Sequence, residues 1–262
     1  MKTGMLNLLQ GIVVIVAFAS ATGAHASLLN HYAFDGNAND SEGTLHGIVT
    51  GNVTLTQDRF GNANSAYHFA GDDDYIDVGN SSLVGWTDDY SFSAWIRPET
   101  TEPKWPTIIS KWSGISHFET FWFGLDPNGD GLGGERTDTG NHWRTSAVVI
   151  DQWQHVALTY DHSATTLALY VGGQLLQSWN DFSGSTLNNS LSNNILIGAV
   201  KRGPNVAHDF KGDMDDLRIY NTALDAGEIS SIAGVPEPAT LALLGLGLAG
   251  LGFRAKRKKL NS

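Results

Sequence analysis

The sequence of 262 residues contains no cysteine, so its fold gains no stability from disulfide bonds. It also has no uninterrupted apolar run that reaches the roughly 20 residues needed by a membrane-spanning helix. Neither a G-x-S-x-G nor an H-E-x-x-H pattern occurs, which excludes the familiar signatures of serine hydrolases and zinc peptidases. The stability of the folded state must therefore come from burial, hydrogen bonds or bound ions.

Positive charge is scarce as well. The chain has 16 Lys and Arg residues against 27 Asp and Glu residues, which gives a net charge of −11. The two ends hold six of the basic residues, at position 2 and at positions 254–259, so the interior of the chain is more acidic still. An acidic surface repels nucleic acid and anionic lipid, and it suits cations and neutral glycans. We therefore expect no nucleic-acid partner.

The N-terminal segment has the three parts of a secretory signal peptide. Lys2 provides a positive start, Leu6 to Phe18 form a short apolar region, and Ala24-His25-Ala26 is a small-x-small cleavage site. An uncleaved N-terminal anchor is the alternative, but the apolar stretch is short for it. We expect residues 1–26 to be removed as a signal peptide and the mature chain to begin at Ser27.

The C-terminal segment combines a short motif, an apolar run and a basic cluster. Pro236-Glu237-Pro238 is followed by the apolar residues Leu241 to Phe253 and then by five Lys and Arg residues. This order closely resembles the PEP-CTERM sorting signal of Gram-negative bacteria, which implies processing by an exosortase during export and transient anchoring in the inner membrane. An ordinary C-terminal membrane anchor with basic residues in the cytoplasm is the alternative. We therefore expect a domain of residues 27–234 and a sorting segment of residues 235–262.

Between the two signals the sequence predicts short strands separated by turns. Asp225 and Glu228 have the spacing of a capping box, which predicts one short helix over Asp225–Ile232. The pattern as a whole predicts an all-β fold, a two-sheet antiparallel jelly-roll sandwich with one short helix near the C-terminal end of the domain. The segments with strand length and strand composition are Leu28–Phe34, Ala66–Phe69, Tyr75–Val78, Ser91–Arg97, Thr107–Trp112, Phe118–Leu125, Ser146–Ile150, Trp153–Tyr160, Thr165–Val171, Gln174–Trp179, Ile195–Ala199 and Asp213–Tyr220.

A series of motifs gives this pattern a family resemblance. The motifs are Tyr32-Ala33-Phe34-Asp35-Gly36-Asn37-Ala38-Asn39-Asp40, Asp58-Arg59-Phe60-Gly61-Asn62-Ala63, Asp73-Asp74-Tyr75-Ile76, Phe92-Ser93-Ala94-Trp95-Ile96, Trp153-Gln154-His155-Val156-Ala157, Thr159-Tyr160-Asp161, Leu169-Tyr170-Val171 and Asp215-Asp216-Leu217-Arg218-Ile219-Tyr220-Asn221. The series resembles the LamG-like, concanavalin A-like jelly-roll domain of bacterial secreted proteins over nearly all of residues 28–232. It departs from the family pattern in two turns, at Gly172 and at His162. The resemblance implies a sandwich with a concave face, frequent calcium binding, and roles in glycan or protein adhesion.

Catalytic carboxylates do not occur at the spacing that related enzymes use. Jelly-roll β-glucanases carry an acid/base and a nucleophile on one strand as E-x-D-x-E, because residues i, i+2 and i+4 point the same way. Glu119 lies in a predicted strand, but positions 117 and 121 hold no carboxylate. We therefore expect a protein that is not an enzyme, with a glycoside hydrolase as the least favoured alternative.

Two acidic loops are candidate calcium sites. The segment Asp126-Pro127-Asn128-Gly129-Asp130-Gly131 matches the first half of an EF-hand loop. Its twelfth position is Thr137 instead of a bidentate Glu, so a hairpin turn is the favoured interpretation. The segment Asp35-Gly36-Asn37-Ala38-Asn39-Asp40 offers oxygens at alternate positions directly after the first strand.

The second loop is the stronger candidate, because the first and last strands of this fold usually lie side by side. If Leu28–Phe34 pairs antiparallel with Asp213–Tyr220, Asp35 comes near the start of the last strand. Simple alternation places the carboxylates of Asp213 and Asp215 on the core side of the last strand, the side of Leu217 and Ile219. A structural calcium ion would relieve their cost of burial, and hydrogen bonds from backbone amides and Arg218 are the alternative. The predicted calcium ligands are Asp35, Asn37, Asn39, Asp40, Asp213 and Asp215.

The eight Trp residues are many for an acidic, cysteine-free domain. Trp95 and Trp153 belong to the family motifs, and we interpret them as packing residues. Trp105 lies between two prolines and Trp143 follows a Gly-Asn-His loop, so they are the predicted exposed pair for stacking on a sugar ring, although packing is an equal alternative.

Together these features predict an exported, non-catalytic binding module. We expect it to recognise carbohydrate or extracellular matrix polymer at the cell surface or in the matrix of a Gram-negative bacterium. A structural or adhesive envelope protein that binds other proteins or itself is the alternative.

Overall fold

The computed structural model describes residues 27–80, 89–99, 105–112, 121–126, 131–136, 140–144, 147–180, 193–202 and 204–235. The predicted signal peptide and all but the first residue of the predicted sorting segment lie outside these ranges. The described elements are β1 (Leu28–Tyr32), β2 (Ile48–Thr50), β3 (Thr54–Thr56), β4 (Ala66–Ala70), β5 (Tyr75–Asp77), β6 (Tyr90–Pro98), β7 (Thr107–Lys111), β8 (Phe121–Leu125), β9 (Leu132–Arg136), β10 (Gly140–Arg144), β11 (Gln154–Asp161), β12 (Thr166–Val171), β13 (Gln174–Trp179), β14 (Leu196–Ile197), β15 (Val200–Arg202), β16 (Asn205–Ala207), β17 (Lys211–Tyr220) and α1 (Ala226–Ile232).

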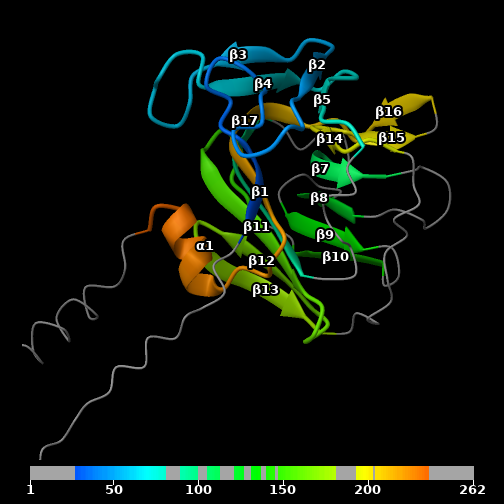
Figure 1. Cartoon of the computed structure of the whole chain (residues 1–262). Coiled ribbons are helices and arrows are strands. Elements are labelled where there is room, and N and C mark those ends of the chain that lie inside the picture. The colour runs from blue at the N-terminus through cyan, green and yellow to red at the C-terminus, as the bar shows by residue number, and fades with distance from the viewer. Residues whose placement is uncertain are drawn as a thin grey trace, which may run out of the picture.

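The strands form two sheets that face each other across a common core (Figure 1). One sheet has the order β13-β12-β11-β6-β17-β4-β3, with β1 also paired to β17, and the other has the order β10-β9-β8-β7-β14-β5-β2. A small hairpin, β15–β16, forms a separate two-stranded sheet. Every strand pairing among the described residues is antiparallel, which confirms the predicted two-sheet sandwich.

The core fills the space between the sheets with alternate residues of each strand. In β6, Phe92, Ala94 and Ile96 are buried in the core, as the alternation predicts. Phe92 meets Phe121 of the opposite sheet, with ring centroids 4.6 Å apart. This contact joins the two layers directly. In the part of the chain that the structure describes, no helix has the length and hydrophobicity to cross a membrane.

The predicted helix forms at the predicted place. Asp225 is the N-cap of α1 and accepts a hydrogen bond from the backbone N–H of Glu228, whose side chain accepts one from the backbone N–H of Asp225. Ile229 packs in a small apolar cluster with Ala157 and Tyr170. These two residues point away from the main core, so α1 covers one end of the outer face of the eight-stranded sheet (Figure 1).

The first and last strands pair as predicted, but the last strand contains an irregularity. β1 and β17 are antiparallel, with Tyr32 opposite Leu217. The register of β17 against β6 shifts between Asp215 and Arg218, and Asp216 has a φ of 54°. This bulge adds a residue to the strand and reverses its alternation.

The bulge overturns the predicted orientation of two carboxylates. Met214 lies in the core, and so do Leu217 and Ile219 beyond the bulge. Asp213 and Asp215 flank Met214 and therefore point to the outer face, so the prediction that they share a side with Leu217 and Ile219 was wrong.

Candidate functional site

The outer face of the seven-stranded sheet carries a row of side chains across four strands. Trp122 lies opposite Ser110, Ser110 opposite Leu196, and Leu196 opposite Asp77. Their neighbours along the strands, among them Ile76, Phe123 and Ile197, fill the core. Because successive side chains of a strand alternate, the row points away from the core.

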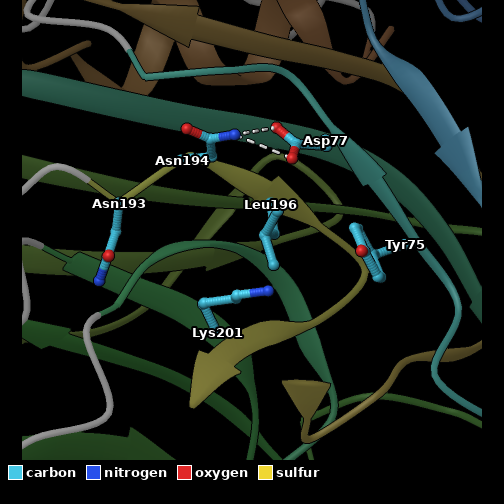
Figure 2. Close-up of a pocket in the computed structure, with 6 residues that line it drawn as sticks. All are labelled: Tyr75, Asp77, Asn193, Asn194, Leu196 and Lys201. Atoms are coloured by element: carbon cyan, nitrogen blue, oxygen red, sulfur yellow. Dashed lines mark hydrogen bonds between the residues drawn. The ribbon is translucent and has the colours of Figure 1, made fainter. Parts of the chain in front are cut away.

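One end of this row is a depression of about 220 Å³ (Figure 2). The Nδ2 of Asn194 lies 2.9 Å from each carboxylate oxygen of Asp77, and the backbone N–H of Gly79 donates to Asp77 Oδ1 over 2.8 Å. These bonds fix the carboxylate at one end of the depression, and Lys201 of the β15–β16 hairpin lies at the other end. The lining residues are Tyr75, Asp77, Asn193, Asn194, Leu196 and Lys201.

This combination of groups is suited to a polyhydroxylated ligand. Asp77 accepts hydrogen bonds, the ammonium of Lys201 donates them, and the amide of Asn193 or Asn194 does both. The ring of Tyr75 and the side chain of Leu196 supply apolar surface next to the polar groups. A few oriented polar groups beside apolar surface are the usual composition of a small-molecule site.

The structure describes the backbone of both predicted ligand-binding tryptophans but the side chain of only one. Trp105 packs edge-on against Trp122 of the outer row, with ring centroids 5.8 Å apart, and is partly exposed. Trp122 donates from Nε1 to Thr107 Oγ1 over 3.0 Å. Trp105 thus lies on the same face as the depression. Trp143 belongs to β10, opposite Gly133, and its side chain lies outside the described part.

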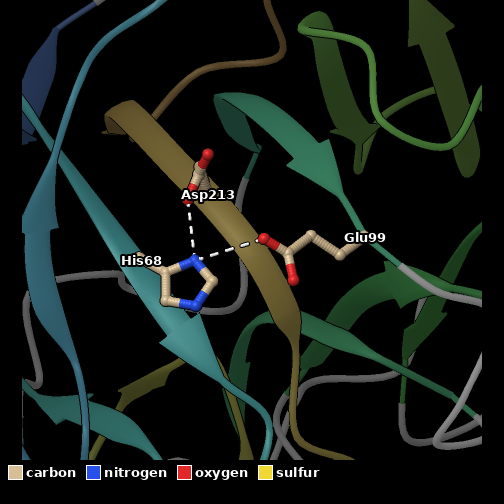
Figure 3. A group of neighbouring side chains, drawn as sticks. All are labelled: His68, Glu99 and Asp213. Carbon is tan, nitrogen blue, oxygen red and sulfur yellow. Dashed lines mark hydrogen bonds and ion pairs between the residues drawn. The ribbon is translucent and has the colours of Figure 1, made fainter.

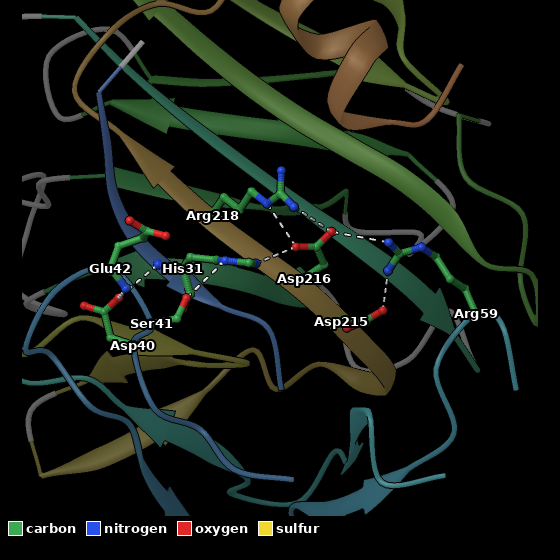
Figure 4. A network of polar contacts seen from close by, with 8 residues as sticks. All are labelled: His31, Asp40, Ser41, Glu42, Arg59, Asp215, Asp216 and Arg218. Carbon is green, nitrogen blue, oxygen red and sulfur yellow. Dashed lines mark hydrogen bonds and ion pairs between the residues drawn. The ribbon is translucent and has the colours of Figure 1, made fainter. Parts of the chain in front are cut away.

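The outer face of the eight-stranded sheet carries a different group of side chains, a network of ion pairs (Figure 4). The guanidinium of Arg59 bonds to both Asp215 and Asp216, and Asp216 also pairs with Arg218 and with His31, the latter over 2.7 Å. A second depression, of about 310 Å³, lies beside the network. Its lining includes the network residues His31, Arg59, Asp215 and Asp216 together with Ala33, Asp35, Asp58, Phe60, Asn62 and Ser65.

Burial has opposite outcomes for the two neighbouring carboxylates. It raises the pKa of Asp215 to about 7, and the charge of Asp216 adds to this rise, although Arg59 pulls the pKa down. Burial also raises the pKa of Asp216, but the hydrogen bond from His31 and the charge of Arg218 outweigh it and hold that pKa below its ordinary value. The network therefore has one carboxylate that holds its charge firmly and one that titrates near neutral pH.

The six predicted calcium ligands do not form one cluster. Asp40 accepts hydrogen bonds from Asn30 Nδ2 over 2.6 Å and from the backbone N–H groups of His31 and Glu42 over 3.0 and 3.1 Å. Burial raises the pKa of Asp40, but these bonds together hold it below its ordinary value. Within the loop, Asn37 Oδ1 accepts a bond from the backbone N–H of Asn39 over 2.8 Å.

The carboxylates of the last strand have arginine partners. Asp213 is bound by Arg97, and Asp215 by Arg59. Asp35 and Asp215 do line one depression, as the strand pairing predicts, but Arg59 already supplies positive charge there. Carboxylates that are already bound by arginine do not fit a single calcium ion between the first and last strands. The calcium site stays a prediction. The observed partners of these carboxylates are backbone amides and arginines, which the sequence analysis gave as the alternative to calcium. The arginines are Arg59 and Arg97 in addition to Arg218.

The Asp126 segment is described only at its two ends. The backbone N–H of Asp126 donates to Gly131 O over 2.9 Å, and Asp126 Oδ1 accepts from the backbone N–H of Gly131 over 3.1 Å. Both bonds join the two ends of the segment. Residues 127–130 lie outside the described part.

A third group, His68, Glu99 and Asp213, lies near the edge of the eight-stranded sheet (Figure 3). His68 Nδ1 is 2.9 Å from Asp213 Oδ1 and 3.6 Å from Glu99 Oε1. Of this group, only Asp213 was a predicted site residue. Tyr75, Asp77 and the other residues of the first depression were not predicted as site residues, because only strand pairing brings either group together.

The family model described as Concanavalin A-like lectin/glucanases superfamily matches residues 70–230, so the chain belongs to this superfamily. The model of the PEP-CTERM protein-sorting motif matches residues 234–258, which marks an exported protein. No curated protein matches the chain.

Solved structures with the same fold include domains of an arabinanase, a sialidase and a neurotoxin. Domain 4 of AbnA, a GH43 extracellular arabinanase from Geobacillus stearothermophilus, in complex with arabinotriose, is 24% identical with a TM-score of 0.62, over 79% of this chain and 98% of that chain. The CBM40 of Ruminococcus gnavus IT-sialidase bound to α2,3 sialyllactose is 18% identical with a TM-score of 0.56, over 64% of this chain and 96% of that chain. The botulinum neurotoxin serotype D binding domain is 18% identical with a TM-score of 0.57, over 79% of this chain and 51% of that chain. At these identities the likeness establishes the shared fold.

Proposed function

We propose that the protein is an exported, non-catalytic module that binds a glycan at the cell surface or in the extracellular matrix. The observation that carries the proposal is the depression on the outer face of the seven-stranded sheet, which is lined by the fixed carboxylate of Asp77, the ring of Tyr75 and, at the opposite end, Lys201. Two of the structural neighbours, solved with arabinotriose and with sialyllactose, add support from the fold.

The size and charge of the site narrow the class of ligand. A volume of about 220 Å³ is small for a drug-sized ligand and suits one or two sugar units of a polymer. The net charge of −11 disfavours polyanionic chains. We therefore propose a neutral polysaccharide as the ligand, with one or two of its sugar units in the depression.

The same depression supports a binding role over catalysis. A two-carboxylate glycosidase needs a pair of Asp or Glu side chains on either side of the scissile bond. Among the six residues that line the depression, Asp77 is the only carboxylate. Asn194 and Gly79 hold it by hydrogen bonds, which favours a fixed acceptor over a nucleophile.

A glycan array probed with a protein of residues 27–235 tests the proposal, because every described strand and the helix lie within this range. We expect binding to neutral polysaccharides, confirmed by calorimetry on the strongest ligand. Tyr75→Ala and Asp77→Asn should each lower the affinity about tenfold or more, since each removes a direct contact. Phe60→Ala is the matched control, because Phe60 is an aromatic residue that is 74% exposed beside the other depression.

Two outcomes would count against the proposal. An array without any retained glycan would contradict the function. Retained binding in both Tyr75→Ala and Asp77→Asn, or an equal loss in Phe60→Ala, would move the site to another face.

A structural or adhesive role is the second candidate, and the edge strand β2 favours it. β2 ends the seven-stranded sheet, and its residues Ile48 and Val49 are 69% and 39% exposed. An exposed apolar edge strand can pair with another chain. Sedimentation of the protein and of Ile48→Lys distinguishes the candidates, since self-association that Ile48→Lys abolishes would support adhesion.

The sorting motif supports an exosortase as the processing partner. We propose that processing removes the segment after about Pro238, following removal of residues 1–26 on export. Mass spectrometry of the protein from its host should then show a chain that begins at Ser27 and lacks the basic C-terminal cluster. A secreted chain that keeps this cluster would contradict the processing.

A further inference from the structure

We propose that His68, Glu99 and Asp213 form a binding site for a divalent transition-metal ion of the zinc class, on the outer face of the eight-stranded sheet (Figure 3). Each residue offers one ligand atom, and the three atoms lie within 4.8 Å of one another. This site is separate from the glycan depression, which lies on the other sheet. It shares only Asp213 with the predicted calcium ligands.

Neighbouring strands hold the three residues in place. His68 of β4 lies directly opposite Asp213 of β17. Glu99 follows the last residue of β6, and its backbone N–H donates to Lys211 O over 3.0 Å. The three side chains thus start from three adjacent strands whose backbones are hydrogen-bonded to one another. A metal ion would find its ligands positioned by a rigid scaffold, which lowers the entropy cost of binding.

The distances suit an ion between the three ligand atoms. Zinc binds imidazole nitrogen and carboxylate oxygen at about 2.0–2.2 Å, so two ligand atoms of a tetrahedral site lie about 3.4 Å apart. His68 Nδ1 is 2.9 Å from Asp213 Oδ1 and 3.6 Å from Glu99 Oε1. The separation between His68 and Glu99 is already close to the tetrahedral value, and a small rotation of the partly exposed His68 ring lengthens its separation from Asp213 toward it.

Arg97 orients the carboxylate of Asp213. It lies opposite Asp213 in the β6–β17 pair, and its Nε donates to Asp213 Oδ2 over 2.8 Å while its Nη2 contacts the same oxygen. These bonds turn Oδ1 toward His68. Asp213 is only 1% exposed, so this orientation is fixed by packing as well. A hydrogen-bonded second partner of this kind commonly orients a metal-binding carboxylate.

Charge and ligand type select the class of ion. Two carboxylates beside one guanidinium leave a net negative charge, which attracts a divalent cation. Calcium and magnesium prefer oxygen ligands, whereas imidazole suits zinc, copper, nickel and iron. Three protein ligands leave a fourth position for water, and the side chains of His68 and Glu99 are 29% and 35% exposed, so solvent reaches this position.

The test uses untagged protein of residues 27–235, stripped with a chelator and titrated with zinc chloride by calorimetry. We expect one equivalent of zinc to bind, and cobalt(II) to give the intense visible absorption of a tetrahedral site. His68→Gln and Glu99→Gln should each lower the zinc affinity at least about tenfold. The matched controls are His162→Gln and Glu42→Gln, a histidine and a glutamate outside the cluster, and both should bind zinc as the parent protein does.

Glu99→Gln is the decisive variant, because its partly exposed side chain can change without unfolding the domain, which circular dichroism verifies. Undiminished zinc binding in Glu99→Gln would overturn the proposal, and so would no zinc binding by the parent protein. Displacement of zinc by equimolar calcium would overturn the assignment to the zinc class. Tyr75→Ala should bind zinc normally, so failure of the glycan proposal and failure of this one are distinguishable.

Discussion

The outer faces of the two sheets use polar side chains in opposite ways. On the eight-stranded sheet, Arg59 and Arg218 neutralise Asp215 and Asp216, and the groups satisfy one another. On the seven-stranded sheet, Asp77 is held in place by Asn194 but lies beside a depression that a ligand can enter. The difference separates polar groups that stabilise the fold from polar groups positioned to bind.

The loop between β3 and β4 explains why the charges of the network on the eight-stranded sheet are satisfied within the protein. Asp58 Oδ1 accepts bonds from the backbone N–H groups of Phe60 and Asn62, each over 2.8 Å, which folds the loop tightly. The loop presents Arg59, whose guanidinium lies 4.7 Å from the ring centroid of Trp95 while it reaches Asp215. One arginine therefore covers an aromatic ring and neutralises buried carboxylates.

The largest effect we expect comes from Arg59→Ala, which breaks the ion-pair network of the eight-stranded sheet. Asp215 and Asp216 are 4% and 11% exposed, so the change leaves buried carboxylates with less compensation. Breaking such a pair on one side typically costs about 3–5 kcal/mol. Urea unfolding at pH 8 measures the loss. Arg202→Ala, at an exposed arginine, should stay within about 0.5 kcal/mol of the parent protein.

A loss below about 1 kcal/mol in Arg59→Ala would contradict this account of the network. It would mean that the ion pairs behave like solvent-exposed ones. The comparison between the two faces would then fail, because neither face would gain stability from its charges.

The second-largest effect we expect is on the pH dependence of the free energy of unfolding, and the variant Asp215→Asn isolates the contribution of Asp215. Burial raises the pKa of Asp215 to about 7, above its ordinary value of 3.8, so between these two pH values the folded state binds a proton that the unfolded state has released. The free energy of unfolding therefore falls as pH rises between those two values. We expect the parent protein to lose about 2–3 kcal/mol more than Asp215→Asn between pH 5 and pH 8.

Urea unfolding of both proteins at several pH values measures this difference. His155 contributes an opposite slope in both, since burial lowers its pKa to about 4 and its neutral form is favoured in the fold. The comparison of the two proteins cancels that contribution. If the free energies of unfolding of the two proteins changed in parallel with pH, Asp215 would keep its charge beside Arg59, contrary to this prediction.

Two variants with small and similar effects on stability should differ in ligand binding, one on each face. Asn194→Ala removes the bonds that orient Asp77, and Asn62→Ala removes the matching bond to Asp58 on the other face, 2.8 Å long. Each change should cost about 1 kcal/mol or less. Calorimetry with the array ligand should show weaker binding for Asn194→Ala alone. Equal weakening by Asn62→Ala would contradict the assignment of the binding face.

Much of the fold could be predicted from the sequence, because local patterns specify it. The predicted strand Gln174–Trp179 has the same bounds in the structure, and the capping box of Asp225 places α1. β9 and β10 were missed, since their Gly-rich and polar sequences become strands only through pairing with β8 and with each other. Residues 147–150, predicted as part of a strand, form none, although Val148 reaches the core.

The candidate sites were harder to predict, because long-range pairing assembles them. Tyr75 and Asp77 lie two residues apart on a predicted strand and therefore share a face, but nothing local placed Asn194 beside them. The bulge at Asp216 reversed the face of two predicted ligands. A positive φ at an Asp has no clear signature in a single sequence, so this error could not be avoided by alternation alone.

The smallest effect we expect is that of calcium on the parent protein. An ion in the depression beside Asp35 and Asp215 has to compete with the guanidinium of Arg59, which already occupies the acidic groups. Calcium should therefore raise the melting temperature of the parent protein by about a degree or less and that of Arg59→Ala by more, since there the carboxylates are released. Scanning calorimetry with chelator, calcium and magnesium measures both responses. A parent protein that loses several degrees in chelator and regains them with calcium would instead support the calcium ion that the sequence predicts at the junction of the first and last strands.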